Sequence, residues 1–421
     1  MKNILNSCLG WLRCISRMLL GFWSSVWTLL GPSSGWTGLK RWLFQIATLG
    51  ILAGLCGFLV SLLGLVPIKA SSGHWPITSW FLKFTMTRSV STHTLGMKVP
   101  ALDNPGMVLK GATHYETGCF PCHGNPTLQH PRIASHMTPH PPYLPPVIEQ
   151  WEPQELFYIV KHGVKFTGMP AWPTQQRDDE VWAMVAFLQK FPELSEQEYR
   201  HMVDGESTMS ESRLPSSSSG EDAPIQELAG RKLLSWSVSD RCGRCHGVDG
   251  QGRQAGVAPK LAGQSPVYLE SSLEAFTRDE RHSGIMAPIA AGLSHEEIRE
   301  IALFYSKLSP SQAMPNSSES ELAIRRGAMI AQGGLPNARI PICAECHGPS
   351  DNPRNPAYPI LAGQYAEYLV LQLELFAADR RGGSEFAPLM HPVANRLTPE
   401  QRRDVALYYE SLAKSVVPPT H

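Results

Sequence analysis

The longest apolar segment of the chain lies near its start and predicts a helix that crosses a membrane. The run LFQIATLGILAGLCGFLVSLLGLV, from Leu43 to Val66, contains no charged residue. A helix needs about 20 mainly apolar residues to cross the hydrocarbon core of a bilayer. A cleaved signal peptide would have a shorter apolar core and a small-x-small cleavage site, which the following VPIKASS does not supply. We therefore predict one transmembrane helix over 43–66.

Basic residues precede this segment and predict its orientation. Lys2, Arg13, Arg17, Lys40 and Arg41 all lie on its N-terminal side, and loops rich in Lys and Arg stay in the cytoplasm. Residues 1–42 are expected to form a cytoplasmic tail, which contains an interfacial helix around its apolar stretch. The protein would then span the inner membrane once, with everything after the span in the periplasm.

The segment over 67–102 is expected to stay close to the membrane. It mixes Trp75, Trp80 and Phe84 with Lys83 and Arg88. Aromatic and basic side chains in this mixture are typical of the membrane–water interface. The segment is expected to lie at the outer membrane surface or to pack against a membrane partner.

Further along the chain, apolar residues recur with the spacing of helices. Such patterns cover 105–118, 178–191, 225–236 and 321–333. Loops with many Gly and Pro separate them, and the alternation typical of strands is scarce. The predicted fold class is mainly α.

One short motif occurs three times. CFPCHG begins at Cys119, CGRCHG at Cys242 and CAECHG at Cys343. The last two copies also share longer stretches, since APKLAGQSPVYL matches YPILAGQYAEYL and IREIALFYSKL matches RRDVALYYESL. The expected units are domain 1 over 103–200, a linker over 201–224, domain 2 over 225–309, a linker over 310–320 and domain 3 over 321–415. The first linker is rich in Ser and suggests that domain 1 moves independently.

Charge is distributed unevenly along the chain. Nine of the 37 Lys and Arg residues precede Asp103, whereas none of the 37 Asp and Glu residues does. The part from Asp103 onward therefore has an excess of acidic residues. Nucleic acid is excluded as a partner by this charge, and a basic face on another redox protein is favoured.

The repeated motif favours covalent haem. C-x-x-C-H places two thiols to reach the two vinyl groups and a histidine to bind the iron. Zinc would require two more ligands at each site, and a redox C-x-x-C pair would require a thioredoxin-like context. We expect three haem c groups, attached through these cysteines: Cys119, Cys122, Cys242, Cys245, Cys343 and Cys346. The iron would be bound by His123, His246 and His347.

With these motifs, each unit resembles a class I cytochrome c domain, a small helical fold around one haem. Domains 2 and 3 together resemble the tandem diheme cytochrome c4 family. In its haem count, the whole chain resembles the membrane-bound triheme cytochrome c subunits of bacterial dehydrogenases. The resemblance implies one N-terminal transmembrane helix followed by three class I cytochrome c domains.

A methionine follows each motif at a distance that allows the chain to reach the other haem face. Met169 lies in FTGMPAWP, which resembles the methionine loop of class I cytochromes c. Met286 and Met390 lie on Pro-flanked loops that align across the repeat. We expect these three residues to be the sixth iron ligands, with His391 as the competitor of Met390.

The resemblance also implies a carbonyl acceptor for each axial histidine, from a Pro-x-Leu segment. The matching prolines are Pro142, Pro259 and Pro359. Arg281 and Arg381 are expected either to pair with haem propionates or to be solvated charges at helix ends.

Ligation by histidine and methionine fills both axial positions and leaves no site for a substrate. The sequence therefore favours an electron carrier without catalytic residues, although it leaves the question of enzymatic activity open. The first interpretation is a membrane-anchored periplasmic triheme cytochrome that carries single electrons in a respiratory chain to a terminal oxidase. The alternatives are the cytochrome subunit of a membrane-bound dehydrogenase and a haem enzyme with one open haem.

Overall fold

The computed structural model describes residues 38–66, 68–204, 242–253, 257–310, 321–350 and 352–412. The chain divides into two units, Met1–Ser72 and Gly73–His421. Most of the expected cytoplasmic tail, the pattern over 225–236 and nearly all of both linkers lie outside the described residues.

The first unit contains helix α2, Gly38–Leu62, whose length and apolar composition suffice to cross a membrane. None of its side chains is buried. The helix begins five residues before the predicted span 43–66 and ends four residues before its end. It ends there because Gly64 has a φ of 67° and Leu65 N–H donates to the Val60 carbonyl, which closes the last turn.

The second unit begins with domain 1, which consists of helices and loops. Its helices are α3 (Pro76–His93), α4 (Pro105–Gly118), α5 (Phe120–His123), α6 (Pro145–Ile148), α7 (Pro153–His162), α8 (Asp178–Lys190) and α9 (Glu196–Asp204). The helices predicted over 105–118 and 178–191 are thereby confirmed. Helix α4 starts where it does because the Asn104 side chain accepts hydrogen bonds from the N–H groups of Gly106 and Met107.

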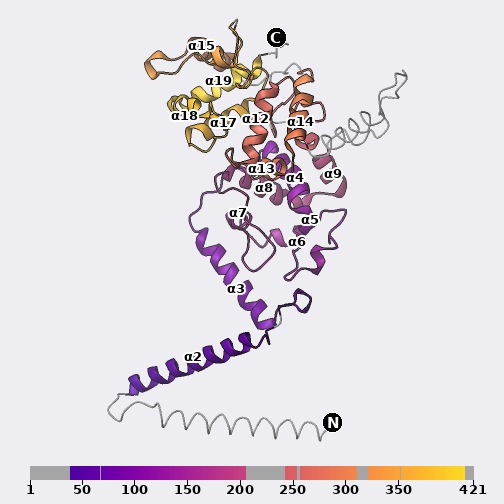
Figure 1. Ribbon diagram of the computed structural model, residues 1–421, viewed down its shortest axis with the longest axis vertical. Coiled ribbons are helices and arrows are strands. Elements are labelled where there is room, and N and C mark those ends of the chain that lie inside the picture. Colours follow the sequence, from indigo (N-terminus) through magenta and orange to yellow (C-terminus); the bar gives the residue numbers. More distant parts are fainter. Residues whose placement is uncertain are drawn as a thin grey trace, which may run out of the picture. The chain divides into compact units, whose positions relative to one another are not determined.

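The core of domain 1 lies where α4 crosses α8. Tyr115, Phe187, Phe191 and Tyr199 pack there with their rings in contact, as the neighbouring α4 and α8 in Figure 1 indicate. Tyr199 and Val203 of α9 are buried in the same core. Helix α9 therefore packs on the core of the region predicted as domain 1.

Domains 2 and 3 repeat one arrangement. Domain 2 contains α11 (Arg244–His246), α12 (Pro266–Thr277), α13 (Met286–Ala291) and α14 (His295–Lys307). Domain 3 contains α15 (Glu321–Gly333), α16 (Cys343–His347), α17 (Ala366–Ala377), α18 (Ala387–Arg396) and α19 (Pro399–Ser411). The helix predicted over 321–333 is confirmed as α15. The closing helices α14 and α19 both begin with a capping box, Ser294 with Glu297 and Thr398 with Gln401.

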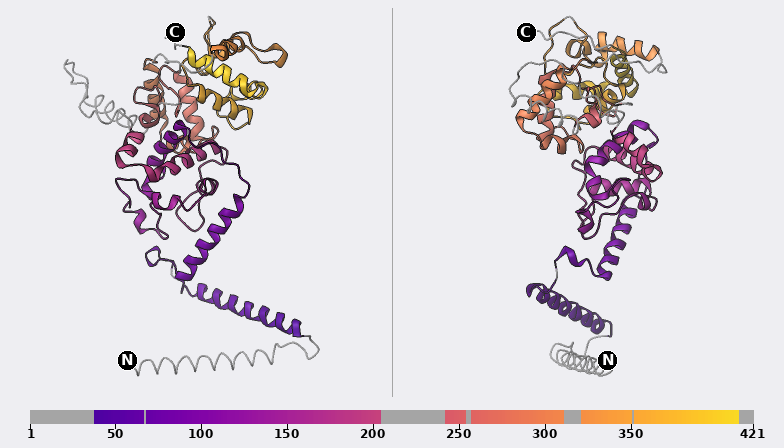
Figure 2. Two further views of the ribbon diagram at one scale, coloured as in Figure 1. Left: turned by 180° about the vertical axis from the view of Figure 1, so that it is seen from behind. Right: turned by 90° about the vertical axis from the view of Figure 1, so that its right-hand side faces the viewer.

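Strands are absent from the described residues, which contain only one isolated bridge between Leu335 and Ile340. Both views in Figure 2 accordingly show coiled ribbons and loops in the described part of the chain. The mainly α fold class is confirmed. Short 3-10 helices lie at Ala70–Ser72, Ala134–His136, Phe191–Glu193 and Pro336–Ala338.

A glycine allows the close crossing of α15 and α19. A Cβ atom on Gly327 would lie 2.0 Å from the Asp404 carbonyl oxygen, so only glycine fits without a shift of the backbone. We expect Gly327→Ala to lower the free energy of unfolding by about 1–3 kcal/mol, the usual cost of overpacking a core. Gly333→Ala in the same helix is the control, because a Cβ there has no neighbour within 4 Å. Thermal denaturation measures both, and an equal melting temperature for the two variants would contradict the packing argument.

Candidate functional site

Each repeated motif folds into one helical turn that ends at its histidine. The turns are the short helices α5, α11 and α16. A glycine with positive φ follows each histidine, with φ values of 73° at Gly124, 75° at Gly247 and 73° at Gly348. The positive φ lets the chain leave the turn sharply while the two thiols and the imidazole stay on the same turn.

Each of the three histidines makes the same kind of hydrogen bond, from its Nδ1 to a proline carbonyl oxygen. The distances are 2.8 Å from His123 to Pro142, 2.9 Å from His246 to Pro259 and 3.0 Å from His347 to Pro359. An imidazole that donates from Nδ1 keeps the lone pair of Nε2 free for a metal ion. Burial lowers the pKa of all three rings, against the effect of the proline carbonyl, and this favours the neutral form that binds metal.

The six cysteines of the motifs are free thiols in the structure. Burial raises the pKa of Cys119 to about 12 and that of Cys343 to about 11. It also raises the pKa of Cys245. These groups therefore stay protonated at neutral pH. Among the described residues, no cluster of three or more His, Cys, Asp or Glu side chains forms a cage for a metal ion.

One cavity lies mainly between domains 2 and 3, and Lys110 and Glu180 of domain 1 also line it. Its lining includes the motif residues of both domains and the two candidate methionines, which are His246, Met286, His347 and Met390. Tyr305 and Tyr409 also line this cavity, and their hydroxyl groups are buried without a hydrogen-bond partner among the described residues. A buried hydroxyl normally has a partner, so these residues fit a cavity that binds a group with polar atoms.

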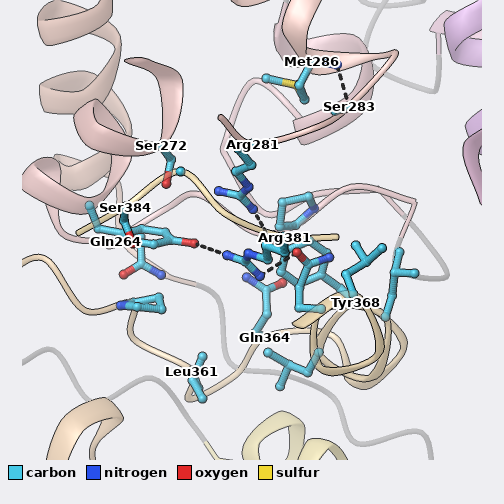
Figure 3. A pocket seen from close by; sticks show the side chains of 18 of the residues that line it. Gln264, Ser272, Arg281, Ser283, Met286, Leu361, Gln364, Tyr368, Arg381 and Ser384 are labelled. Carbon is cyan, nitrogen blue, oxygen red and sulfur yellow. Dashed lines mark hydrogen bonds between the residues drawn. The ribbon is translucent and has the colours of Figure 1, made fainter. Parts of the chain in front are cut away.

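Two arginines meet in the same cavity, and Figure 3 shows their guanidinium groups converging. Arg281 donates to the Tyr368 hydroxyl, and Arg381 donates to the Tyr268 hydroxyl. The donor–acceptor distance is 3.1 Å in both hydrogen bonds. Arg381 is only 9% exposed, so its interpretation as a solvated charge at a helix end is wrong.

The surroundings of the two arginines indicate what kind of group the pocket fits. Neither Arg281 nor Arg381 forms an ion pair with a carboxylate of the described residues. Burial would raise the pKa of Tyr268, but the two guanidinium groups lower it to about 8. This positive field favours an anion, so the pocket fits a group that carries carboxylates.

Reciprocal contacts between domains 2 and 3 hold the proline segments. Gln364 accepts from the N–H of Lys260 at 3.0 Å and donates to its carbonyl at 3.1 Å. Gln264 makes the same pair of bonds with Ile360, at 2.8 and 3.0 Å. Lys260 and Ile360 follow directly after the prolines that accept from the histidines. Each domain thereby fixes the backbone beside the other domain's imidazole.

Their contacts distinguish the two candidate iron ligands of domain 3, Met390 and His391. Met390 lines the cavity from α18, and Met286 is the first residue of α13, so the prediction that both lie on loops is wrong. His391 uses both ring nitrogens elsewhere, because Nε2 lies 2.8 Å from the Arg381 carbonyl oxygen and Nδ1 lies 2.8 Å from Asp379 Oδ1. These contacts favour Met390 as the residue that is free to bind.

Domain 1 has a cavity of its own beside Cys122 and Pro142. Met169 is not among the residues that line it, and lies half-buried on a loop where its N–H donates to Thr167 Oγ1. The terminal methyl of Met137 packs against this loop, since a Cβ on Gly168 would lie 2.0 Å from it.

Comparison with known proteins extends this picture. Residues 106–188 match the family model described as cytochrome c oxidase, cbb3-type, subunit III, and residues 230–309 match the cytochrome c model. Cytochrome c-552 of Acidithiobacillus ferridurans is 34% identical over 181 residues, which cover 42% of this chain and 76% of that protein. A thiosulfate dehydrogenase electron acceptor of Thiomonas intermedia is 35% identical over 179 residues, 42% of this chain and 80% of that protein.

Cytochromes c4 are similar as well. That of Pseudomonas aeruginosa is 31% identical over 191 residues, which cover 45% of this chain and 92% of that protein. Among solved structures, cytochrome c4 of Acidithiobacillus ferrooxidans aligns with a TM-score of 0.37 and 34% identity, over 42% of this chain and 100% of that one.

Proposed function

The chain belongs to the cytochrome c family, and on that premise we propose that it is a membrane-anchored carrier of single electrons with three covalent haems. The observation that carries the proposal is the histidine of each motif, oriented by a proline carbonyl with Nε2 free. Cytochrome c domains imply covalent haem c, and the third repeat of the motif supports a count of three.

The proposed haem sites use the residues of the three motifs. The thioether bonds would form at Cys119, Cys122, Cys242, Cys245, Cys343 and Cys346. The axial ligands would be His123 with Met169, His246 with Met286, and His347 with Met390. Bound haem supplies one-electron chemistry at its iron, and ligation by histidine and methionine raises its reduction potential.

The protein's own residues orient the group and keep it dry. Pro142, Pro259 and Pro359 fix the imidazoles, and the largely apolar lining of the shared cavity excludes water. Arg281 and Arg381 would bind the haem propionates, which would supply the anionic partners that these side chains do not find in the described part of the chain. No residue is required to move a proton, because only electrons pass through the site.

Membrane attachment would come from α2, with the N-terminus in the cytoplasm and the haem domains in the periplasm. Helix α3 supports this arrangement. Its Trp80 and Phe81 are exposed, and so is Trp75, directly before the helix. Lys83 follows Phe81 by two residues. Such side chains suit the membrane–water interface, so α3 would hold domain 1 close to the bilayer.

The proposed partners are redox proteins of a respiratory chain, with a terminal oxidase as the acceptor. A second candidate is the cytochrome subunit of a dehydrogenase that oxidises a small sulfur compound. Relatives described as thiosulfate dehydrogenase electron acceptors favour such a dehydrogenase as the electron donor. In either case the acidic surface from Asp103 onward suits a basic face on the partner.

Electron transfer to a basic acceptor tests the proposal. We expect the reduced full-length protein in detergent to pass electrons rapidly to a lysine-rich soluble cytochrome c. Salt should slow the reaction, because exposed charges are screened beyond about 10 Å at 0.1 M. Stopped-flow absorbance gives the rates, with an acidic copper protein of similar potential as the control. Equal rates at all salt concentrations would contradict docking by charge, and no transfer to either acceptor would contradict the carrier function.

A further inference from the structure

A buried carboxylate of domain 1 contacts the loop of domain 2 that leads into Met286. Glu180 lies in the first turn of α8 and is only 2% exposed. Its Oε1 accepts a hydrogen bond of 2.6 Å from the Ser283 hydroxyl, and its Oε2 accepts one of 2.6 Å from the Gly284 N–H. Both partners belong to domain 2, more than a hundred residues further along the chain.

The Ser283 hydroxyl continues the chain of hydrogen bonds to Met286. It accepts from the N–H of Met286 at 3.0 Å and from that of Ile285 at 3.3 Å, and Figure 3 shows the bond between Ser283 and Met286. A serine hydroxyl can donate once and accept twice. Since Ser283 donates to Glu180, the carboxylate fixes the hydroxyl orientation that the Met286 backbone requires.

Further contacts of domain 1 hold the same loop. Arg177 pairs with Glu180 at 3.1 Å and donates to the His282 carbonyl at 2.9 Å. Gly284 packs against the Trp172 indole, since a Cβ there would lie 2.0 Å from Nε1. Domain 1 therefore contacts three consecutive residues, 282–284, just before α13 begins at Met286.

The duplicated loop of domain 3 is built differently. The chain from Arg281 to Met286 reads RHSGIM, whereas that from Arg381 to Met390 reads RGGSEFAPLM. Met390 lies inside α18, and the neighbouring His391 bonds to the Arg381 carbonyl within domain 3. Among the described residues, a carboxylate of domain 1 contacts the segment before Met286, and none contacts the corresponding segment before Met390.

We propose that Glu180 is a positioning residue for the methionine ligand of domain 2. The docked domain 1 holds residues 282–284, and this sets how firmly Met286 stays on the iron of the second haem. The inference rests on the proposed function, because it requires Met286 to be an iron ligand. It adds a dependence of the second haem, and not of the third, on the presence of domain 1.

Displacement of the methionine by imidazole tests this role in the full-length protein with its haems bound. In Glu180→Gln we expect added imidazole to bind one of the haems about tenfold more tightly, because a charge-assisted hydrogen bond to the loop is lost. The methionine–iron charge-transfer band of one haem should weaken, while the haem content stays unchanged. Ser283→Ala should give the same phenotype, and the double variant should add little to either change.

The control is Glu193→Gln, because Glu193 is an exposed carboxylate of domain 1 that pairs only with Lys190 among the described residues. It should leave imidazole affinity and the band as in the native protein. Native behaviour of both Glu180→Gln and Ser283→Ala would overturn the positioning role. Met286→Ala separates the two proposals: if it also leaves every haem unchanged, the ligand assignment itself is wrong, and if it alters one haem, only the role of Glu180 fails.

Discussion

The double variant Cys242→Ala/Cys245→Ala is expected to lose about a third of the covalent haem, because each C-x-x-C-H motif attaches its own group. The thiols of the other two motifs lie elsewhere, with Cys119 directly before α5, Cys122 in α5, and Cys343 and Cys346 in α16. Their attachment should therefore proceed in the variant. The intact mass of the denatured protein measures the loss directly, as one haem fewer per chain.

Cys56→Ala is the matched control for this experiment. Cys56 is an exposed free thiol of α2 and lies outside every motif. Its replacement should leave the haem content unchanged. A double variant whose mass still included three haems would contradict attachment at Cys242 and Cys245.

Replacing Met390 by Ala is expected to open one iron to carbon monoxide and to lower one midpoint potential by on the order of 100 mV, since axial ligands set haem potentials over a range of about 0.8 V. Met390 lines the cavity that also contains His347. Without the thioether, the sixth position becomes available to a small ligand. Absorbance spectra of the reduced protein under carbon monoxide, with a potentiometric titration, measure both effects.

His391→Ala provides the comparison, because both nitrogens of His391 are bound to Arg381 and Asp379. The variant should not bind carbon monoxide, and its potentials should match those of the native protein. The reverse result, with carbon monoxide bound by His391→Ala and not by Met390→Ala, would make the imidazole the ligand of the third haem.

Local features of this chain could be predicted well from its sequence. The helices over 105–118 and 321–333 agree with α4 and α15, because their periodic apolar residues and end signals act over a few residues. The single turn of each motif follows from its short spacing. The proline carbonyls lie beside the histidines, as the resemblance implied, because the same Pro-x-Leu pattern recurs after each motif.

Contacts between distant segments could not be predicted. From sequence, Glu180 is one of three acidic residues in the first turn of α8, where an acid stabilises any helix. Its burial depends on docking against Ser283 and Gly284, which no local pattern encodes. The Ser-rich linker suggested an independent domain 1, whereas Arg253 also donates to the Val203 carbonyl across the two domains. Likewise, no local pattern indicated that Val203, which lies in the segment predicted as a linker, would be buried.

The most direct test of the central proposal is a potentiometric titration of the full-length native protein, followed through the haem bands with and without carbon monoxide. If histidine and methionine occupy both axial positions of all three irons, all three haems should have a high potential and none should bind the gas. One haem of low potential that binds carbon monoxide in the native protein would contradict the carrier function and indicate a haem enzyme or a gas sensor.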